Sequence, residues 1–146
     1  QLEALRTVLE RIRKIRAQGD AAGGLEQAMD EVMSFVEADL TNLRVMIELY
    51  NAAAQSPSMA LQLERFDAEV DRLVTRGLQT LLGPAEALMV IPLDRVVRLF
   101  RTLFNGLILE LTCASTEAAR QRVRDTFTDA KTLLVRATLI GGQNVG

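Results

Sequence analysis

Between positions 92 and 114, apolar residues occupy nearly every side of the helix that their spacing predicts. One stripe recurs at intervals of three and four residues and consists of Leu93, Val96, Phe100, Phe104, Leu107 and Leu111. A second group widens this stripe beyond a single face and consists of Val97, Leu99, Leu103, Ile108 and Leu109. A surface helix carries one apolar stripe. This helix therefore needs cover from several directions, and we expect a second subunit to provide part of it.

The N-terminal half of the chain predicts three more helices. Apolar spacing predicts the first over residues 2–17, with a flexible turn at 21–24 after it. The second begins near Leu25, and the third covers residues 41–55. Residues 39–42 either break the two apart or join them, because Asp, Thr and Asn side chains compete for backbone hydrogen bonds.

Two capping residues mark the helices that follow. Ser56 is the expected N-cap of a fourth helix, with Pro57 at its first position and its end near Leu82. Ser115 is the expected N-cap of the last helix, which carries a narrow apolar stripe. No segment alternates apolar and polar residues as a strand does. The fold class is therefore predicted as all-α, with five to six helices.

Composition agrees with one aliphatic, helical domain. The chain is 49% hydrophobic and 25% charged, as in globular proteins, and only 4% aromatic. We expect a single domain over residues 1–140 and a disordered tail at 141–146. The net charge of −2 argues against nucleic-acid binding through phosphate contacts by this chain alone.

Several kinds of chemistry are excluded by the residues that the chain lacks. It has no histidine and one cysteine, so we expect no catalytic triad, no metal site and no cofactor. No apolar run approaches the roughly 20 residues that span a bilayer, and a soluble cytoplasmic protein without a membrane partner is expected. The first residue is not methionine, and helical spacing starts at once. We therefore expect that a preceding part is missing.

Three positions in the apolar helix over residues 92–114 are unusual. Glu110 is either a polar anchor in a buried pocket or a residue at the solvent edge, paired with an arginine such as Arg101 or Arg124. Gly106 costs about 1 kcal/mol in a helix interior, which close approach of another helix would offset. Asn105 then either bonds across that contact or to a ligand, or it is simply exposed.

Adaptable apolar side chains on successive helices suggest a small-molecule pocket. Thioethers, aromatic rings and a phenol form the typical lining of such a pocket, although plain core packing explains the same residues. The candidate ligand-binding residues are Met33, Met46, Tyr50, Phe66, Phe104 and Asn105.

Three stretches resemble the C-terminal regulatory domain of TetR-type transcriptional repressors. NLRVMIELYNAAAQSPSMALQLERF is similar to a helix, short turn and long helix of that family. VVRLFRTLFNGLILEL is similar to its penultimate helix, and TEAARQRVRDTFTDAKTLLVRA is similar to its last helix. The likeness covers almost the whole chain in the order and lengths of the helices.

This resemblance implies a homodimer in which the last two helices of each subunit form a four-helix bundle. The interface residues expected from it are Leu99, Leu103, Leu107, Val123, Phe127 and Leu134. It also implies a lipophilic or aromatic effector between the middle helices and the penultimate one. DNA would be bound only through an N-terminal helix-turn-helix that this chain lacks. The alternatives are a helical dimerisation scaffold without a ligand and, ranked below it, an enzyme that uses Glu110 as an acid.

Overall fold

The computed structural model is all-α in the part of the chain that it describes, with short turns between the helices. That part comprises residues 3, 6–8, 10–11, 21–83, 86 and 89–139. Its long helices are α2 (Ala21–Ala38), α3 (Leu40–Ala53), α4 (Pro57–Leu82), α5 (Leu93–Cys113) and α6 (Glu117–Leu139). No strand occurs among these residues, so the all-α prediction is confirmed. Most of the helix predicted over residues 2–17, and the predicted tail, lie outside the described residues.

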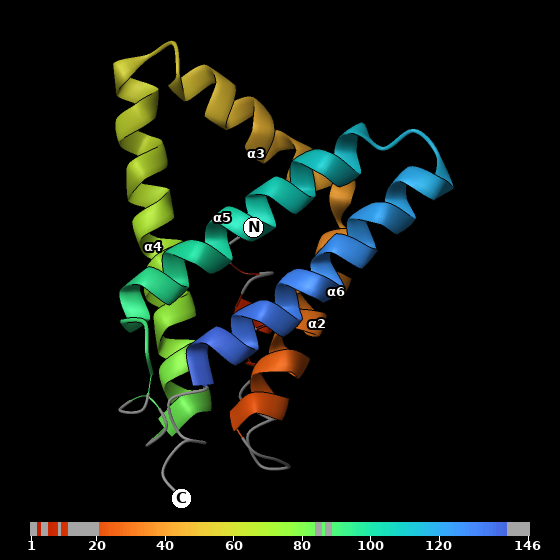
Figure 1. Ribbon diagram of the computed structural model, residues 1–146. Helices are drawn as coiled ribbons and strands as arrows, with labels where there is room; N and C mark the ends of the chain where they lie inside the picture. The colour runs from red at the N-terminus through yellow and green to blue at the C-terminus, as the bar shows by residue number, and fades with distance from the viewer. Residues whose placement is uncertain are drawn as a thin grey trace, which may run out of the picture.

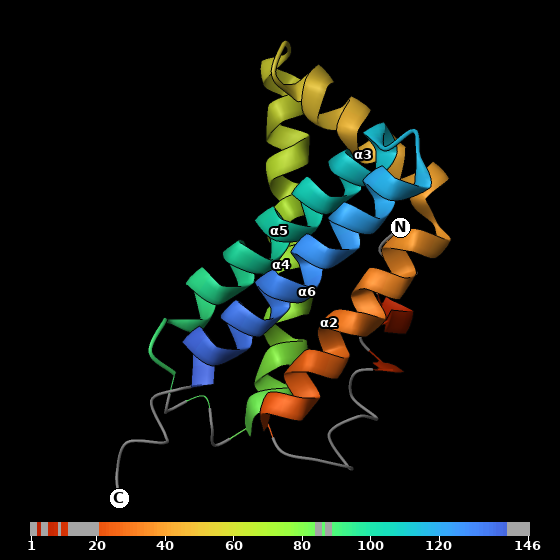
Figure 2. The ribbon, with the colours of Figure 1, turned by 45° about the vertical axis from the view of Figure 1, so that its right-hand side comes forward.

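Helices α3, α4 and α5 run along the three sides of a triangle, and each packs against the other two (Figure 1). Helix α6 follows α5 after a short turn and lies antiparallel beside it (Figure 2). Helix α2 packs against α6 on one side and α4 on the other. As a result, α5 is covered by α3, α4 and α6.

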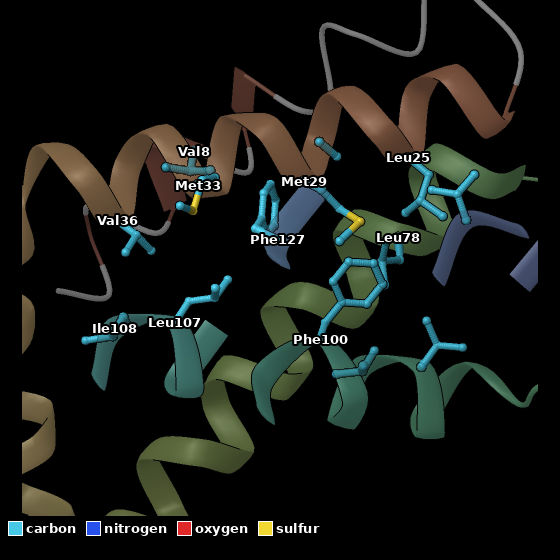
Figure 3. Close-up of a cluster of buried hydrophobic side chains, with 14 of the residues drawn as sticks. Val8, Leu25, Met29, Met33, Val36, Leu78, Phe100, Leu107, Ile108 and Phe127 are labelled. Atoms are coloured by element: carbon cyan, nitrogen blue, oxygen red, sulfur yellow. The ribbon is translucent and has the colours of Figure 1, made fainter. Parts of the chain in front are cut away.

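The core lies between α2 and α5. Figure 3 shows Met29 and Met33 of α2 facing Phe100 and Leu107 of α5, with Phe127 of α6 beside them. All five side chains are buried. The thioethers fill the space between the larger rings, as flexible methionine side chains do in irregular cores.

Two ion pairs join α6 to α2 at the rim of this core. Arg124 Nε lies 2.6 Å from Glu37 Oε1, and Lys131 Nζ lies 2.6 Å from Asp30 Oδ1. Partly exposed pairs of this kind contribute about 0–1 kcal/mol each. The apolar contacts therefore hold α6 in place, and the ion pairs select its register against α2.

The start of α2 differs from the prediction. Residues 21–24 are helical and not a flexible turn, so α2 begins four residues before Leu25. Gly24 is buried, and a Cβ atom placed there would lie 2.9 Å from Leu81 Cδ1 on α4. Close packing of the two helices at Gly24 thus offsets the low helix propensity of glycine.

Asp39 resolves the question of a break between the second and third predicted helices. It is the single non-helical residue there, with φ −121° and ψ 23°. Its carboxylate accepts a hydrogen bond from Asn42 Nδ2 at 2.5 Å, and its backbone oxygen accepts from the Asn42 and Leu43 amides. Side-chain competition thus ends one helix and begins the next within one residue.

The start of α4 agrees with the prediction and the start of α6 does not. Ser56 Oγ accepts a hydrogen bond from the Met59 amide at 3.5 Å, and Pro57 opens the helix. At α6, however, Thr116 is the N-cap, since its Oγ1 accepts from the Ala119 amide at 3.1 Å. Ser115 lies one residue too early to reach an unpaired amide of the first turn.

Replacing each of these neighbouring residues by alanine should distinguish the observed N-cap from the predicted one. We expect Thr116→Ala to lower the free energy of unfolding by about 1 kcal/mol, because an amide of the first turn loses its acceptor. Ser115→Ala should change it by less than about 0.5 kcal/mol, as an exposed substitution without a partner does. Urea unfolding followed by circular dichroism measures both, and equal losses would contradict this assignment.

Candidate ligand-binding site

A cavity of about 170 Å³ lies among four helices, and its residues come from α2, α3, α4 and α5. An apolar cavity of about 150 Å³ accommodates one aromatic ring. It is lined by Leu25, Ala28, Met29, Val32, Phe35, Val36, Leu43, Met46, Phe66, Val70, Val74, Gly77, Leu78, Phe100, Arg101, Phe104, Asn105 and Ile108.

Helical spacing brings these side chains to the cavity. On α4, Phe66, Val70 and Val74 follow one another at four-residue intervals and therefore share one face. On α5, Phe100 and Phe104 repeat the same interval, and their rings stack with centroids 6.4 Å apart. Phe66, Val70 and Val74 are partly buried, whereas Gly77 and Leu78 further along α4 are fully buried.

Nearly the whole lining is apolar, and its polar side chains lie on one turn of α5. Among the described residues that line the cavity, Arg101 and Asn105 alone carry polar side-chain atoms. They are four residues apart and therefore lie one above the other on the helix surface. The cavity thus has an apolar body and one polar end.

Behind this polar end, Arg101 forms ion pairs with two carboxylates of α4. Its guanidinium contacts Asp67, and its Nε lies 2.8 Å from Asp71 Oδ1. The Nε–H bond does not point at the Asp71 oxygen, so this second contact is an ion pair without a well-aligned hydrogen bond. Burial alone would lower the pKa of Arg101, but the charges of Asp67 and Asp71 outweigh it and raise the pKa.

Tyr50 of α3 completes the polar cluster. Its hydroxyl donates to the Asp67 carboxylate at 3.0 Å and accepts from Asn105 Nδ2 at 2.9 Å. Burial, followed by the hydrogen bond to Asp67, raises the pKa of Tyr50, while the Asn105 hydrogen bond and the Arg101 charge act in the opposite direction. Through Tyr50, Asp67 and Arg101, the cluster connects α3, α4 and α5.

The candidate ligand-binding residues occupy three kinds of position. Met46, Phe66, Phe104 and Asn105 line the cavity. Met33 does not line it, because its side chain is buried in the core between α2 and α5. Tyr50 also lies outside the lining, and its hydroxyl accepts a hydrogen bond from Asn105. Neither Met33 nor Tyr50 therefore lines the cavity.

Patterns in the sequence did not predict the acidic part of the cluster. Asp67 and Asp71 lie four residues apart on α4, and Arg101 faces both from α5. The spacing of the two acids indicated a shared face, but the partner across the fold lies more than 25 positions away in the sequence. The suggestion that Arg101 or Arg124 pairs with Glu110 was wrong. Arg101 instead forms ion pairs with Asp67 and Asp71. Arg124 forms ion pairs with Glu37 and Glu117.

Half of the predicted dimer interface is buried within the chain itself. Leu107, Val123 and Phe127 are 3%, 5% and 4% exposed, because α2, α5 and α6 cover them, so they leave little surface for a partner. Leu103 and Leu134 are partly buried against the same core.

Of the predicted interface residues, Leu99 leaves the most surface exposed, at 45%. It belongs to the outer side of α5 and α6, where Leu109 and Leu133 are also exposed, at 47% and 68%. Gly106 lies on this side as well, and no described atom lies within 4 Å of the Cβ that a larger residue would carry there. The helix contact expected at Gly106 is therefore not made within the described chain.

Glu110 lies beside a shallow depression between the ends of α5 and α6. Its side chain is exposed, as is the free Cys113, and the depression is lined also by Ala119 and Arg122. This position matches the solvent-edge interpretation of Glu110. Across the described residues, no cluster of Cys, Asp or Glu side chains has the arrangement of a metal site.

Comparisons with known proteins add no relative. No family model matches the chain, and searches of curated proteins and of solved structures return no match. Within the described part of the chain, no helix combines the length and apolar character needed to cross a membrane. The cavity and the outer side of α5 and α6 are therefore the features that bear on function.

Tyr50 reports directly on the polar cluster, because the chain has one tyrosine and no tryptophan. We expect it to ionise above its usual pKa of 10.0 in the folded chain. Asp67→Asn should lower this pKa, because the carboxylate charge that favours the neutral phenol is lost. Asn105→Ala should raise it further, because a hydrogen bond that favours the phenolate is lost.

Phenolate absorbance during an alkaline titration measures these shifts, with the urea-unfolded chain as the reference. The pKa of Tyr50 is raised in the folded state, so its neutral phenol stabilises the fold. This contribution to the free energy of unfolding is complete below the pKa of Tyr50 in the unfolded chain, and it is lost as pH rises through the pKa in the folded chain. Identical pKa values in the folded and unfolded chains would contradict the cluster geometry.

Proposed function

We propose that this chain is the ligand-sensing and dimerisation domain of a TetR-like transcriptional regulator, most simply a repressor. The observation that supports it is the apolar cavity between α2, α3, α4 and α5, with its polar end at Arg101 and Asn105. A largely apolar cavity with a few convergent polar groups is the usual form of a small-molecule site. The resemblance implies an effector site between the middle helices and the penultimate helix.

The cavity supports a mechanism based on a shift of populations. Four helices line it, so a ligand that fills it binds more tightly to one arrangement of these helices than to another. That difference in affinity is the free energy available for signalling. In the proposed regulator, the helix expected over residues 2–17 carries it to a DNA-binding domain that precedes this one.

The outer side of α5 and α6 supports the dimer. Leu99, Leu109 and Leu133 are exposed there, and Gly106 leaves room for close approach of another helix. Two antiparallel helices from each of two subunits form a four-helix bundle when such sides meet. The same leucines favour the second candidate, a helical dimerisation module without any small ligand, and binding to the cavity distinguishes the two.

Filling the cavity should abolish ligand binding without unfolding the chain. Val74 lines the cavity and is partly buried, whereas Val45 on α3 is 48% exposed and does not line it. We expect toluene to raise the melting temperature of the native chain and of Val45→Phe, but not that of Val74→Phe. The stabilisation should follow RT ln(1 + [L]/Kd), or about 2.7 kcal/mol at one hundred times Kd.

Calorimetry or dye-based melting measures this difference. An equal response of Val74→Phe and Val45→Phe would place the bound molecule elsewhere. A native chain that responds to no apolar compound in a broad panel would remove the sensor and leave the dimerisation module.

The dimer has its own matched pair of variants. Leu109 on the outer side of α5 and Leu61 on α4 are 47% and 49% exposed. We expect Leu109→Glu to give a monomer, because it buries a charge in the apolar interface, and Leu61→Glu to leave the dimer intact. Light scattering over a range of protein concentrations measures both, and a dimer that survives Leu109→Glu would refute this interface.

A further inference from the structure

The polar end of the cavity determines which polar groups a bound molecule can carry. Arg101 and Asn105 face the cavity from α5, whereas Asp67, Asp71 and Tyr50 do not belong to its lining. A ligand that fills the apolar body therefore meets an arginine and an amide, and the carboxylates lie behind them.

Part of the hydrogen-bonding capacity of this pair is already used. Asn105 Nδ2 donates to Tyr50, and the Tyr50 hydroxyl in turn donates to Asp67. Arg101 Nη1 donates to Asp67, and Arg101 Nε is in ion-pair contact with Asp71. Within the described structure, the Asn105 side-chain oxygen and the Arg101 Nη2 group make no hydrogen bond, so one acceptor and a pair of donors remain.

The charge balance disfavours an acidic ligand. Arg101 carries one positive charge and contacts two carboxylates, so the cluster has a net charge of −1. A ligand carboxylate would bring this total to −2 in a cavity with apolar walls, where charges are weakly screened. Arg101 therefore has no free positive charge to offer a carboxylate.

The geometry disfavours a cationic ligand as well. An ammonium group in the cavity would meet Arg101, the one charged side chain of the lining, whereas Asp67 and Asp71 do not line the cavity. A neutral group meets neither obstacle. A carbonyl or hydroxyl oxygen satisfies Arg101 Nη2, and an N–H or O–H satisfies the Asn105 oxygen.

We propose that the cavity selects a neutral effector, with an apolar body about the size of one aromatic ring and a single amide or hydroxyl group held by Arg101 and Asn105. This inference rests on the proposed function, because it concerns the ligand of the same site. It adds the charge of that ligand and the residues that discriminate it.

Ring compounds that differ only in their polar group test this inference. Benzamide is neutral, benzoate is anionic and benzylammonium is cationic at pH 7, and toluene has no polar group. Titration calorimetry with the native chain should give the lowest Kd for benzamide. We expect benzoate and benzylammonium to bind at least about tenfold more weakly, as one unfavourable charge in a partly buried site implies.

Asp71→Asn should change the selectivity without removing the fold, since asparagine keeps an oxygen beside Arg101. The cluster then becomes neutral, and benzoate should gain about tenfold in affinity while benzamide stays within about twofold. Glu64→Gln is the matched control, because Glu64 is an exposed acid on the same helix outside the cluster. It should leave all four affinities unchanged.

The outcomes separate this inference from the proposed function. The selection of a neutral group is overturned if benzoate or benzylammonium binds most tightly. It is also overturned if benzoate gains as much affinity in Glu64→Gln as in Asp71→Asn. Either result leaves the proposed ligand sensor intact. If toluene binds as tightly as benzamide, Arg101 and Asn105 do not hydrogen-bond the polar group of the ligand, and the inference is overturned. Failure of all four compounds to bind overturns the proposed function itself.

Discussion

The need to cover α5 determines how the rest of the chain is arranged. This helix is apolar on more than one side, and its sides have different surroundings. Its innermost residues, such as Val96 and Leu107, are buried in the core. Phe104 faces the cavity and also packs on Phe127 of α6, with ring centroids 5.9 Å apart. The outer side, with Leu99, stays exposed. One helix thus contributes to the core, the cavity and the surface proposed for a partner.

The polar cluster connects three helices of the fold and also forms one end of the cavity. Tyr50, Asp67 and Arg101 come from three different helices, and their contacts depend on the relative positions of all three. Partly buried ion pairs add little net stability, since desolvation offsets the attraction between the charges. Their geometric requirement remains, however. A molecule that displaces Asn105 by a fraction of an ångström therefore disturbs hydrogen bonds that reach α3 and α4.

Local signals predicted most of the fold, and residues distant in sequence account for the errors. The cap at Ser56 and the extent of α5 follow from residues within one turn. Residues 21–24 were predicted as a turn because the glycines favour it locally, whereas in the structure they are helical and Gly24 packs closely against Leu81 of α4. Helical spacing identified Phe127 as apolar but did not reveal that its own subunit buries it. The pairing of Arg101 with acids of α4 depends on how two helices meet, which periodicity does not contain.

The single residue between α2 and α3 has a mechanical consequence. Asp39 interrupts an otherwise continuous helical run, and residues on both sides of it line the cavity. Helix α3 has 14 residues and is therefore about 21 Å long. A rotation of about 10° at Asp39 would carry its far end through roughly 4 Å, which is the scale of one side chain. The Tyr50 hydroxyl lies near the end of α3 that joins α4 and is hydrogen-bonded to Asp67 and Asn105, so a rotation of this size at Asp39 would break both hydrogen bonds.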